Sequence, residues 1–365
     1  MNTTNFNHEQ DPAPHVFLGM SGGVDSSAAA LVLLQKGYQV SGLNLQLFDQ
    51  TQPQQKAKAS ADAEDAAAVA QRLGFPLHIL DCSSQFRDFV VREFIAEYEA
   101  GRTPNPCIVC NRTIKFGVLL DEALAMGADY IASGHYARVE YDDASGRWLL
   151  KRATDRSKDQ SYFLAQLTQW QLSHALFPLG DLTKVQAREL AEKGGLINAR
   201  KRDSQDICFV PDGDYASVIS QLTGRTSPEG DFLSMDGKVL GQHKGFIRYT
   251  KGQRRGLGIS AGEPIYVIDK DPVSLSVTLG PDSALWAQEL TAEHMNWISI
   301  PTLDKPMAVS VKVRNTQKDA SAVVEPLPGN RVRVIFDAPQ RAITPGQAVV
   351  LYDDDIIVGG GIICK

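Results

Sequence analysis

Short apolar runs alternate with longer amphipathic segments over the first 212 residues of the chain. The short runs favour buried strands, and the Ala- and Leu-rich segments that stop at a glycine favour helices. The predicted strands cover 15–19, 39–45, 77–80 and 130–133, and the predicted helices cover 26–36, 56–73, 86–100 and 113–126. Strands and helices in this alternation are typical of βαβ units. We therefore predict a doubly wound α/β domain whose parallel sheet is covered on both faces.

The periodicity changes after about residue 211. Glycines separate short runs over 239–267, and from residue 275 onward apolar and polar residues alternate, over 308–314, 322–325, 331–336, 348–351 and 356–359. Runs of period two between Gly, Pro and Asp turns are typical of an antiparallel barrel or sandwich. We predict three domains: the α/β domain over 1–212, a small central domain over 213–281 and a C-terminal antiparallel β-barrel over 282–365.

The composition is that of an ordinary globular protein. Of 365 residues, 43% are hydrophobic and 22% are charged, which excludes a disordered tail or a collagen-like chain. No apolar run approaches the roughly 20 residues that cross a bilayer, and the polar segment 1–14 lacks a secretory core. We expect a cytoplasmic protein without a membrane segment. The net charge of −6 argues against a general nucleic-acid coat but leaves room for a local basic surface.

A loop rich in glycine and serine joins the first predicted strand to the first predicted helix. It reads Gly19-Met-Ser-Gly-Gly-Val-Asp-Ser-Ser27. Small residues let the backbone approach a ligand, and the serine hydroxyls and free N–H groups at a helix start favour an anion. The loop is neither a Walker A loop nor a GxGxxG loop. The residues alone allow a phosphate-binding loop or a Ser-capped helix after a glycine turn.

Three of the five cysteines lie in informative surroundings. Cys107 and Cys110 follow a proline loop, and Cys208 follows a polar run. We expect Cys110 near the start of a helix, where Arg112 and Lys115 lower the pKa of its thiol. Three interpretations stay open: a zinc site, a three-cysteine iron–sulfur site, or redox thiols of which one carries a persulfide. Without a secretory segment, reduced thiols are favoured over structural disulfides, and we expect the remaining cysteines, Cys82 and Cys364, to be packing residues.

Seven stretches of the chain, in order, resemble those of the bacterial tRNA-specific 2-thiouridylase family. They are GMSGGVDSS, GRTPNPCIVCNRTIKFG, ASGHYA, KDQSYFL, KRDSQDICF, YTKGQRRGLGI and RAITPGQAVVLYD. The first is similar to the SGGxDS loop of the ATP-pyrophosphatase superfamily. The resemblance implies an N-terminal domain of the adenine nucleotide alpha hydrolase-like fold, a small central domain and a C-terminal barrel.

The resemblance also implies a reaction. ATP adenylates the C2 oxygen of the wobble uridine in tRNA, and sulfur from a cysteine persulfide then replaces that oxygen, which yields 2-thiouridine, AMP and pyrophosphate. Asp25 is in addition expected to contact Mg²⁺ or a hydroxyl group. The implied nucleotide-binding residues are Gly19, Met20, Ser21, Gly22, Gly23, Val24, Asp25, Ser26, Leu45 and Gly134.

By the same resemblance Cys208 carries the persulfide, and Cys110 is the nucleophile that resolves the reaction through a transient disulfide with Cys208. Cys107 replaces an Asp to which the family assigns acid–base work, and a thiol has a higher reference pKa, about 8.5 against about 3.9. Cys107 is then a thiolate, or Asp203 or Asp206 substitutes, or the step is not needed, or Cys107 has no role. The replacement also strengthens the iron–sulfur alternative, with ligands Cys107, Cys110 and Cys208.

The implied partners are tRNA and a protein that donates sulfur. His135 alone is equally consistent with a packed residue, and Asp159 alone with a solvated helix N-cap. Several residues add local positive charge, namely Lys201, Arg202, Lys251, Arg254 and Arg255. The residues that match tRNA contacts are Asn105, Pro106, Cys107, His135, Lys158, Asp159, Gln160, Arg314, Asn315 and Gln347.

Two other classes of protein explain part of the sequence. An ATP-pyrophosphatase-type synthetase that acts on a small molecule would use the glycine-rich loop, but it would leave the three cysteines and the barrel unexplained. An RNA-binding protein with a structural metal site would use the barrel and the cysteines, but it would leave the loop without a role.

Overall fold

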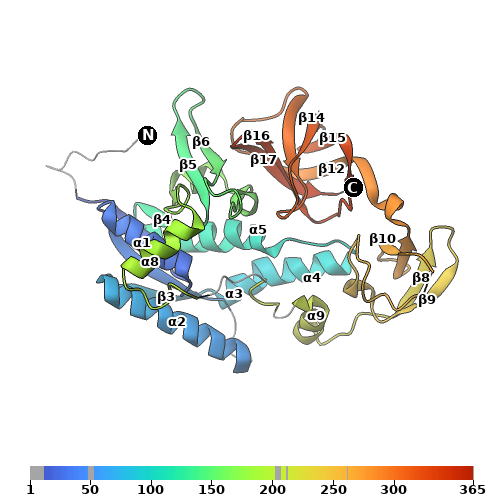
Figure 1. Ribbon diagram of the computed structural model, residues 1–365, viewed down its shortest axis with the longest axis horizontal. Coiled ribbons are helices and arrows are strands. Elements are labelled where there is room, and N and C mark those ends of the chain that lie inside the picture. Colours follow the sequence, from blue (N-terminus) through green and yellow to red (C-terminus); the bar gives the residue numbers. More distant parts are fainter. Residues whose placement is uncertain (1–11, 48–52, 202–206, 211–212, 261, 365) are drawn as a thin grey trace.

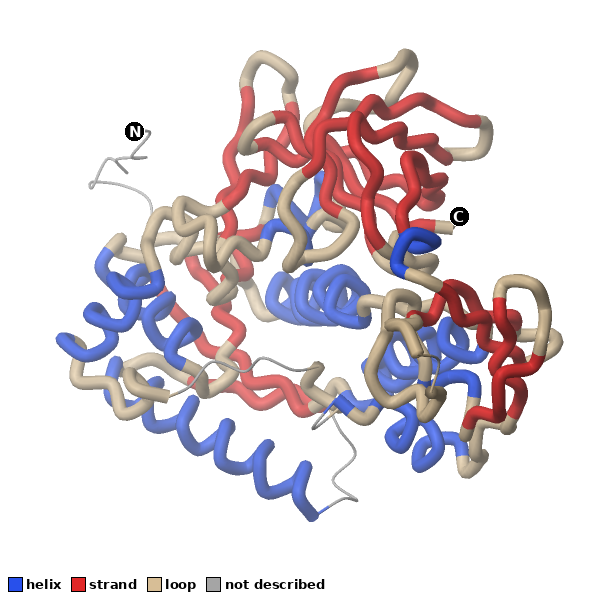
Figure 2. The backbone as a smooth tube through the Cα atoms, turned by 45° about the vertical axis from the view of Figure 1, so that its right-hand side comes forward, coloured by secondary structure: helices blue, strands red, loops and turns tan. Residues whose placement is uncertain are grey.

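The strands of the protein gather in three regions, and each region is one sheet (Figures 1 and 2). This computed structural model describes residues 12–47, 53–201, 207–210, 213–260 and 262–364. Within these ranges no helix combines the length and the apolar character that a membrane crossing requires.

The N-terminal sheet has five strands, and all of its pairings are parallel. Their spatial order is β3 (Leu77–Asp81), β2 (Gln39–Gln46), β1 (His15–Gly19), β4 (Tyr130–Ala132) and β7 (Ala175–Leu176). The chain builds outward from β1 in both directions, so the switch point lies between β1 and β4. Ligands bind outside the carboxyl ends of the strands at such a point. The predicted doubly wound sheet is confirmed.

Strand β1 distributes its side chains to both faces of the sheet. Val16 and Leu18 belong to the hydrophobic cluster formed with α1 (Val24–Gln35), α2 (Pro53–Leu73) and α8 (Lys184–Lys193). Phe17 belongs to the opposite cluster, formed with α6 (Leu119–Ala125). Successive side chains of a strand point to opposite faces, so the continuous apolar run in β1 results from burial on both sides.

The helix that carries Cys107 and Cys110 begins earlier than predicted. It starts at Pro106 instead of residue 113 and runs as α5 (Pro106–Cys110), a π-helical segment (Asn111–Val118) and α6. Proline fits the first helical position because its missing N–H has no partner there. The segment predicted as a helix over 86–100 is likewise divided, into α3 (Ser83–Phe86), a π-helical segment (Arg87–Val91) and α4 (Arg92–Glu99).

The C-terminal sheet closes into an antiparallel barrel, as predicted. Its order is β12 (Trp286–Trp297), β15 (Arg331–Arg341), β14 (Ala320–Leu327), β13 (Met307–Lys312), β16 (Ala348–Asp353) and β17 (Ile356–Ile363), and β17 pairs with β12. The middle sheet holds β8 (Gly230–Ser234), β9 (Val239–His243), β10 (Tyr266–Asp271) and β11 (Ser276–Gly280), preceded by α9 (Tyr215–Thr223). Shorter helical segments cover Ser161–Leu164, α7 (Gln169–Ser173), Phe246–Arg248 and Asp282–Leu285.

A hairpin from the N-terminal part joins the barrel. Strands β5 (Ala137–Asp142) and β6 (Arg147–Arg152), which the sequence analysis did not identify, extend the barrel sheet where Lys151 pairs with Ile356. Beside this junction the guanidinium of buried Arg152 forms an ion pair with Asp319 and stacks 3.6 Å from the centre of the Tyr352 ring. The α/β domain and the barrel therefore share a backbone pairing and a buried cation.

Substitution of Arg152 tests whether this buried cation contributes more to the free energy of unfolding than an exposed charge does. Arg152→Met should lower the free energy of unfolding by about 2 kcal/mol or more, because it removes a desolvated ion pair and a cation–π contact. Lys151→Met is the matched control, since its partner Glu140 is exposed and such pairs contribute less than about 1 kcal/mol. Urea unfolding of both variants tests this, and equal losses would contradict a special role for Arg152.

Candidate functional site

The glycine-rich loop lies at the switch point of the parallel sheet. It connects the end of β1 to the start of α1, and the residues after β4 pack directly against it. A Cβ atom on Gly134 would lie 2.8 Å from backbone atoms of Asp25 and Ser26. Gly22 has a φ of +69°, and a Cβ there would lie 2.2 Å from the backbone oxygen of Asp62. Both positions therefore require glycine, and the loop predicted for phosphate binding occupies the ligand position of the fold.

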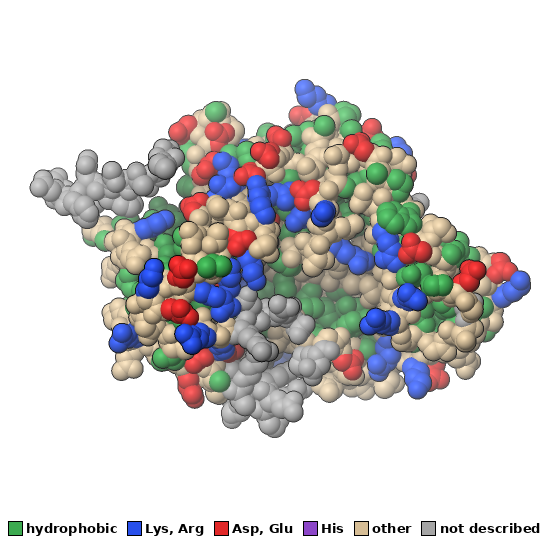
Figure 3. All heavy atoms as spheres, viewed as in Figure 1, with side chains coloured by type: hydrophobic (Ala, Val, Ile, Leu, Met, Phe, Trp, Pro, Cys, Tyr) green, Lys and Arg blue, Asp and Glu red, His purple; other side chains and the backbone are tan. Residues whose placement is uncertain are grey.

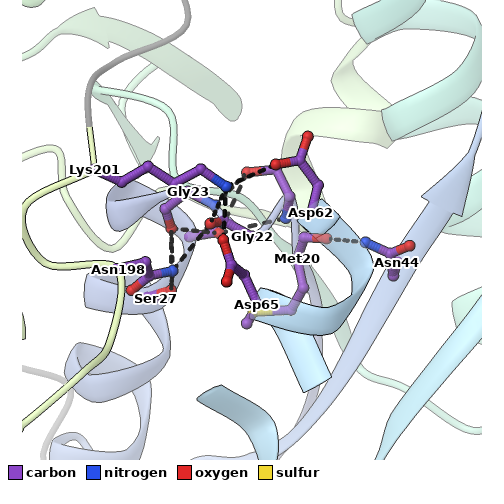
Figure 4. Close-up of polar contacts among 11 residues, drawn as sticks. Met20, Gly22, Gly23, Ser27, Asn44, Asp62, Asp65, Asn198 and Lys201 are labelled. Carbon is purple, nitrogen blue, oxygen red and sulfur yellow. Dashed lines mark hydrogen bonds and ion pairs between the residues drawn. The ribbon is translucent and has the colours of Figure 1, made fainter. Parts of the chain in front are cut away.

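Side chains from outside the loop hold its carbonyl groups in place (Figure 4). The amide nitrogen of buried Asn198 donates to the backbone oxygens of Gly22 (3.0 Å) and Gly23 (3.4 Å) and to the Ser27 hydroxyl (2.8 Å). In a trans peptide the C=O and the following N–H point in opposite directions. The N–H groups of Gly23 and Val24 thus face away from Asn198, at the positive end of α1, which is the arrangement that binds an anion. In this structure the Gly23 N–H donates a long bond, 3.4 Å, to the Ser21 hydroxyl.

Lys201 lies on the same side of the loop as Asn198. Its ammonium is 2.7 Å from the carboxylates of Asp62 and Asp65 and 3.3 Å from the Gly22 oxygen (Figure 4). Burial acts to lower the pKa of Lys201, but the hydrogen bonds with the two carboxylates outweigh it and raise the pKa. The cation predicted for a tRNA surface is instead part of the loop's support, while Arg202 lies outside the described residues.

The Asp25 carboxylate is bound by other side chains and is not available as a metal ligand. Its carboxylate accepts hydrogen bonds from the Lys184 ammonium at 2.7 and 2.8 Å and from the Tyr136 hydroxyl at 2.9 Å. Magnesium in nucleotide sites is held by one or two carboxylates together with the phosphates. Here the fixed charge of Lys184 occupies the one carboxylate of the loop, so we derive no step through Mg²⁺.

The three cysteines lie in one neighbourhood. Buried Cys110, the last residue of α5, belongs to the same hydrophobic cluster as Phe209, the residue after Cys208. The Phe209 ring packs edge-on against Phe86 and Phe94, with centroid distances of 5.6 and 5.0 Å. Cys208 itself is exposed. The structure thus fixes the chain beside Cys208 against the cluster that holds Cys110.

The predicted lowering of the Cys110 pKa is wrong. Burial raises the pKa of Cys110 and of Cys107, and Lys115 opposes this rise only in part. The local sequence showed the cations but not the burial. Although Cys208 exposes surface to solvent, desolvation of its sulfur, reinforced by the neighbouring thiols of Cys110 and Cys107, raises its pKa to about 12. All three are therefore neutral thiols at pH 7.

The described residues offer no ready metal centre. Among them no three His, Cys, Asp or Glu side chains are grouped closely enough to hold a metal ion. All five cysteines are free thiols. The three-thiol ligand set of the iron–sulfur alternative is thus not assembled, and we derive no step through a cluster.

Comparison with known proteins places the chain in a family. Its sequence matches the tRNA methyl transferase HUP domain over residues 14–212, the tRNA methyl transferase PRC-barrel domain over 218–281 and the aminomethyltransferase beta-barrel domain over 287–363. It is 48% identical to the tRNA-specific 2-thiouridylase MnmA of Acetivibrio thermocellus, over 95% of this chain and 98% of that protein. It is 45% identical to the MnmA of Clostridioides difficile, over 96% and 98%. The chain belongs to the tRNA-specific 2-thiouridylase family.

Solved structures show weaker likeness. A 4-thiouridine synthetase–RNA complex with bound ATP is 18% identical, with a TM-score of 0.36, and the match covers 58% of this chain and 50% of that one. The NMN synthetase of Francisella tularensis is 17% identical, with a TM-score of 0.35, over 60% and 80%.

Among the residues of this 2-thiouridylase predicted to contact tRNA, His135 packs against other side chains, whereas Asn105 and Pro106 lie at the start of α5. His135 is packed: its Nδ1 is 2.7 Å from the Ser133 hydroxyl, its ring neighbours Phe116 and Phe177, and desolvation, with Lys115 adding to it, holds its pKa well below the usual value. His135 is therefore neutral at pH 7. Asn105 directly precedes α5, and Pro106 is its first residue. Leu45 is expected to contact the adenine of ATP. It lies in β2, two residues after Leu43, the last residue of that strand that pairs with β1.

The segment 158–160 is more buried than its sequence indicated. Asp159 accepts hydrogen bonds from the Ala153 N–H and from the N–H and hydroxyl of Ser161, so it is not a solvated N-cap. Gln160 accepts from the Tyr136 N–H. Asp159 and Asn315 nevertheless line one cavity of about 630 Å³, together with Arg152, Arg156 and Lys312.

Sequence reasoning missed the residues that hold the loop of this 2-thiouridylase from outside. Asn198 and Lys184 come from segments that carry no motif for an anion site, and Asn198 lies 176 residues from Gly22. Only the packing of α8 and the segment after it on α1 brings them to the loop.

The hold of Asn198 on the loop predicts an effect on ATP binding. Asn198→Ala should raise the Kd for ATP roughly tenfold, about 1.4 kcal/mol, because the two carbonyls lose the donor that they share and keep only separate partners, Lys201 for Gly22 and two serine hydroxyls for Gly23. Asn296→Ala is the matched control, since this amide also donates to two backbone carbonyls, those of Ala165 and Leu167, but supports the barrel. Calorimetric titration measures both, and an unchanged Kd in Asn198→Ala would refute the orienting role.

Proposed function

We propose that this tRNA sulfurtransferase adenylates the C2 oxygen of the wobble uridine with ATP and replaces that oxygen with sulfur carried by Cys208. The proposal rests on two features that this fold brings together, an anion loop and a pair of neighbouring thiols. A preformed anion loop lies at the switch point, and the chain that supports this loop at Asn198 and Lys201 leads, within ten residues, to a thiol beside Cys110.

In the first step the uridine C2 oxygen attacks the α-phosphorus of ATP. An O–P bond forms, and the bond to pyrophosphate breaks. The N–H groups of Gly23 and Val24 hold the leaving pyrophosphate, because the hold of Asn198 on the carbonyls aims these groups outward. A carbonyl oxygen is a poor leaving group, and its conversion to a phosphate ester makes the later displacement easier.

In the second step the outer sulfur of a Cys208 persulfide attacks C2. A C–S bond forms and AMP leaves with the oxygen. The Cys110 thiolate then attacks the Sγ of Cys208, so that the sulfur leaves with the base as 2-thiouridine and a Cys110–Cys208 disulfide forms. A dithiol reductant returns both thiols, and a sulfur-donor protein reloads Cys208. The shared neighbourhood of the two thiols supports this pairing.

Cys107 fits a protonated thiol in this scheme. It lies in the first turn of α5, and burial raises its pKa. The other residues considered for the family's carboxylate, Asp203 and Asp206, lie outside the described residues.

The tRNA is expected to lie across the parts of the chain that meet at the cysteines. Lys and Arg side chains border the hollow in the middle of the face in Figure 3. Phosphate contacts would position the RNA, and contacts to the unpaired bases of the anticodon loop would specify it. Lys158, Gln160 and the cavity that Asp159 and Asn315 share are the proposed contacts outside the cysteine helix.

Radiolabelled pyrophosphate exchange into ATP tests the class of reaction. Exchange should require tRNA, because the attacking oxygen belongs to the base. If exchange ran without RNA, an ATP-pyrophosphatase that acts on a small molecule would replace the proposal. If the protein bound RNA but never turned ATP over, it would be a binding module.

Two cysteine substitutions test the sulfur step. Cys208→Ser should bind ATP and tRNA with Kd values within about twofold of the wild type and support exchange, yet form no 2-thiouridine, because no sulfur can be carried. Cys110→Ser should accumulate tRNA linked to Cys208, because the resolving thiol is missing. Nucleoside analysis and denaturing gels measure the two outcomes.

Cys364→Ser is the control for these substitutions, since that thiol donates to the Thr291 oxygen in the barrel. Full thiolation by Cys208→Ser would end the persulfide assignment. Iron and sulfide in stoichiometric amounts after anaerobic purification, lost when Cys107, Cys110 or Cys208 is replaced by Ser but kept in Cys364→Ser, would replace it with a cluster.

The raised thiol pKa values predict how thiolation responds to pH. Cys110 must be a thiolate to attack, and burial holds its pKa above the ordinary thiol value. The single-turnover rate of 2-thiouridine formation should therefore rise from pH 7 to pH 9, by about tenfold per unit while the thiol is mostly protonated. A flat profile over this range would mean that the thiolate is already formed. Cys82→Ala, which removes a buried thiol outside the reaction, should keep the rise.

A further inference from the structure

A turn of the barrel lies directly against the segment that leads into the cysteine helix. The turn covers 344–347 and the segment covers 102–104. The Thr103 N–H donates to the Pro345 oxygen at 2.9 Å. The Gln347 side-chain nitrogen donates to the Thr103 oxygen at 2.7 Å and to the Pro104 oxygen at 3.3 Å. Three hydrogen bonds thus join two segments that lie more than 240 residues apart in the chain.

The contact is too close for a side chain at Gly346. A Cβ there would lie 2.8 Å from the Thr103 nitrogen and 2.9 Å from the Cβ of Arg102, and the φ of this residue is +89°. Glycine is therefore required for conformation and for space. The backbones of the turn and of the segment lie flush against each other.

The turn is itself braced from inside the barrel. The guanidinium of Arg314 donates to the Thr344 hydroxyl at 2.7 Å and to the Ala342 oxygen at 3.1 Å. Desolvation lowers the pKa of Arg314, as expected for a cation turned into the protein. The Gly346 N–H donates to the Ile363 oxygen of β17 at 2.8 Å. The turn therefore moves only together with the barrel.

On its other side the segment sets the start of α5. Asn105 and Pro106 follow Pro104 directly, the Asn105 oxygen accepts from the Ile108 N–H at 3.2 Å, and Cys107 lies in the first turn. Two proline residues restrict the backbone in between. A displacement of Thr103 and Pro104 would therefore be passed to Cys107 and Cys110.

We propose that Gln347 is a positioning residue of sulfur transfer, which fixes the cysteine helix to the barrel, and that it is not a contact to tRNA. A primary amide has two N–H donors, and both of those of Gln347 are directed at backbone oxygens of the segment 103–104. This inference rests on the proposed function, because it is the Cys107–Cys110 helix of that reaction that Gln347 holds.

The test separates RNA affinity from the rate of the sulfur step in the full chain. For Gln347→Ala, the Kd for unmodified tRNA should stay within twofold, while the rate of 2-thiouridine formation at saturating tRNA falls by roughly tenfold to a hundredfold. The rate at which iodoacetamide labels Cys107 in the absence of tRNA, measured by peptide mass spectrometry, should differ at least threefold from that of the wild type, because α5 is no longer fixed.

Gly346→Ala carries the same prediction by a different route, since it displaces the turn and leaves the amide in place. Gln340→Ala is the matched control, because its amide donates to Ala338 within the barrel. Thermal melting confirms that each variant is folded.

A tenfold rise in the tRNA Kd with an unchanged saturated rate would make Gln347 an RNA contact and overturn the proposal. Unchanged rate and unchanged labelling would overturn it as well. If the wild type formed no 2-thiouridine, the proposed function would fail, while the labelling of Cys107 would still decide whether the barrel fixes this helix.

Discussion

The orientation of two backbone carbonyls, those of Gly22 and Gly23, is the constraint on which the nucleotide site depends. Within the loop the Ser26 and Ser27 hydroxyls both donate to the Gly23 oxygen at 3.0 Å, whereas the Gly22 oxygen accepts from side chains outside the loop. The donors that an anion needs are therefore fully aimed only if a group outside the loop also holds the carbonyls. Asn198 does this from a segment that follows α8. Cys208, the proposed sulfur carrier, follows Asn198 by ten residues in the sequence.

The helix that carries Cys107 and Cys110 is also held by contacts from other parts of the chain. Its first turn follows a segment held by Gln347 from the barrel, and Cys110 packs in the cluster that also holds Phe209. The barrel is joined to the α/β domain a second time through β6 and the Arg152–Asp319 pair. Further bonds join the two parts, among them those of Asn296 to Ala165 and Leu167 and of Arg147 to Ile298. Attachments at several separate places give the barrel a fixed orientation toward α5, which a single flexible linker would not give.

The sequence predicted the elements that local patterns determine. The strand β1, the loop and α1 follow from an apolar run, a glycine turn and an Ala-rich helix, and the barrel follows from period-two alternation. The hairpin β5–β6 was missed although Ala137–Asp142 alternates apolar and polar residues. Its place on the barrel depends on long-range bonds of Arg138, Arg147 and Arg152 to the barrel, which local sequence does not reveal. The helix start at Pro106 was missed because Pro-Asn-Pro indicates a loop equally well. The direction of the Cys110 pKa was wrong because neighbouring cations are visible in a sequence and burial is not.

The raised pKa of Cys208 gives the proposed disulfide exchange a direction. In the intermediate that joins Cys208 to the base through two sulfurs, Cys110 has two sulfurs to attack, and the choice decides which sulfur stays with the tRNA. Attack on the Sγ of Cys208 releases the sulfur of the base, and attack on the other sulfur releases the Cys208 thiolate. The group with the lower pKa leaves faster. A thiol whose pKa is raised to about 12 is a poor leaving group, and the negative charge on a 2-thiouridine sulfur is shared with the ring. The surroundings of Cys208 therefore favour release of the sulfur with the base, so the burial that keeps the thiols protonated also directs the product.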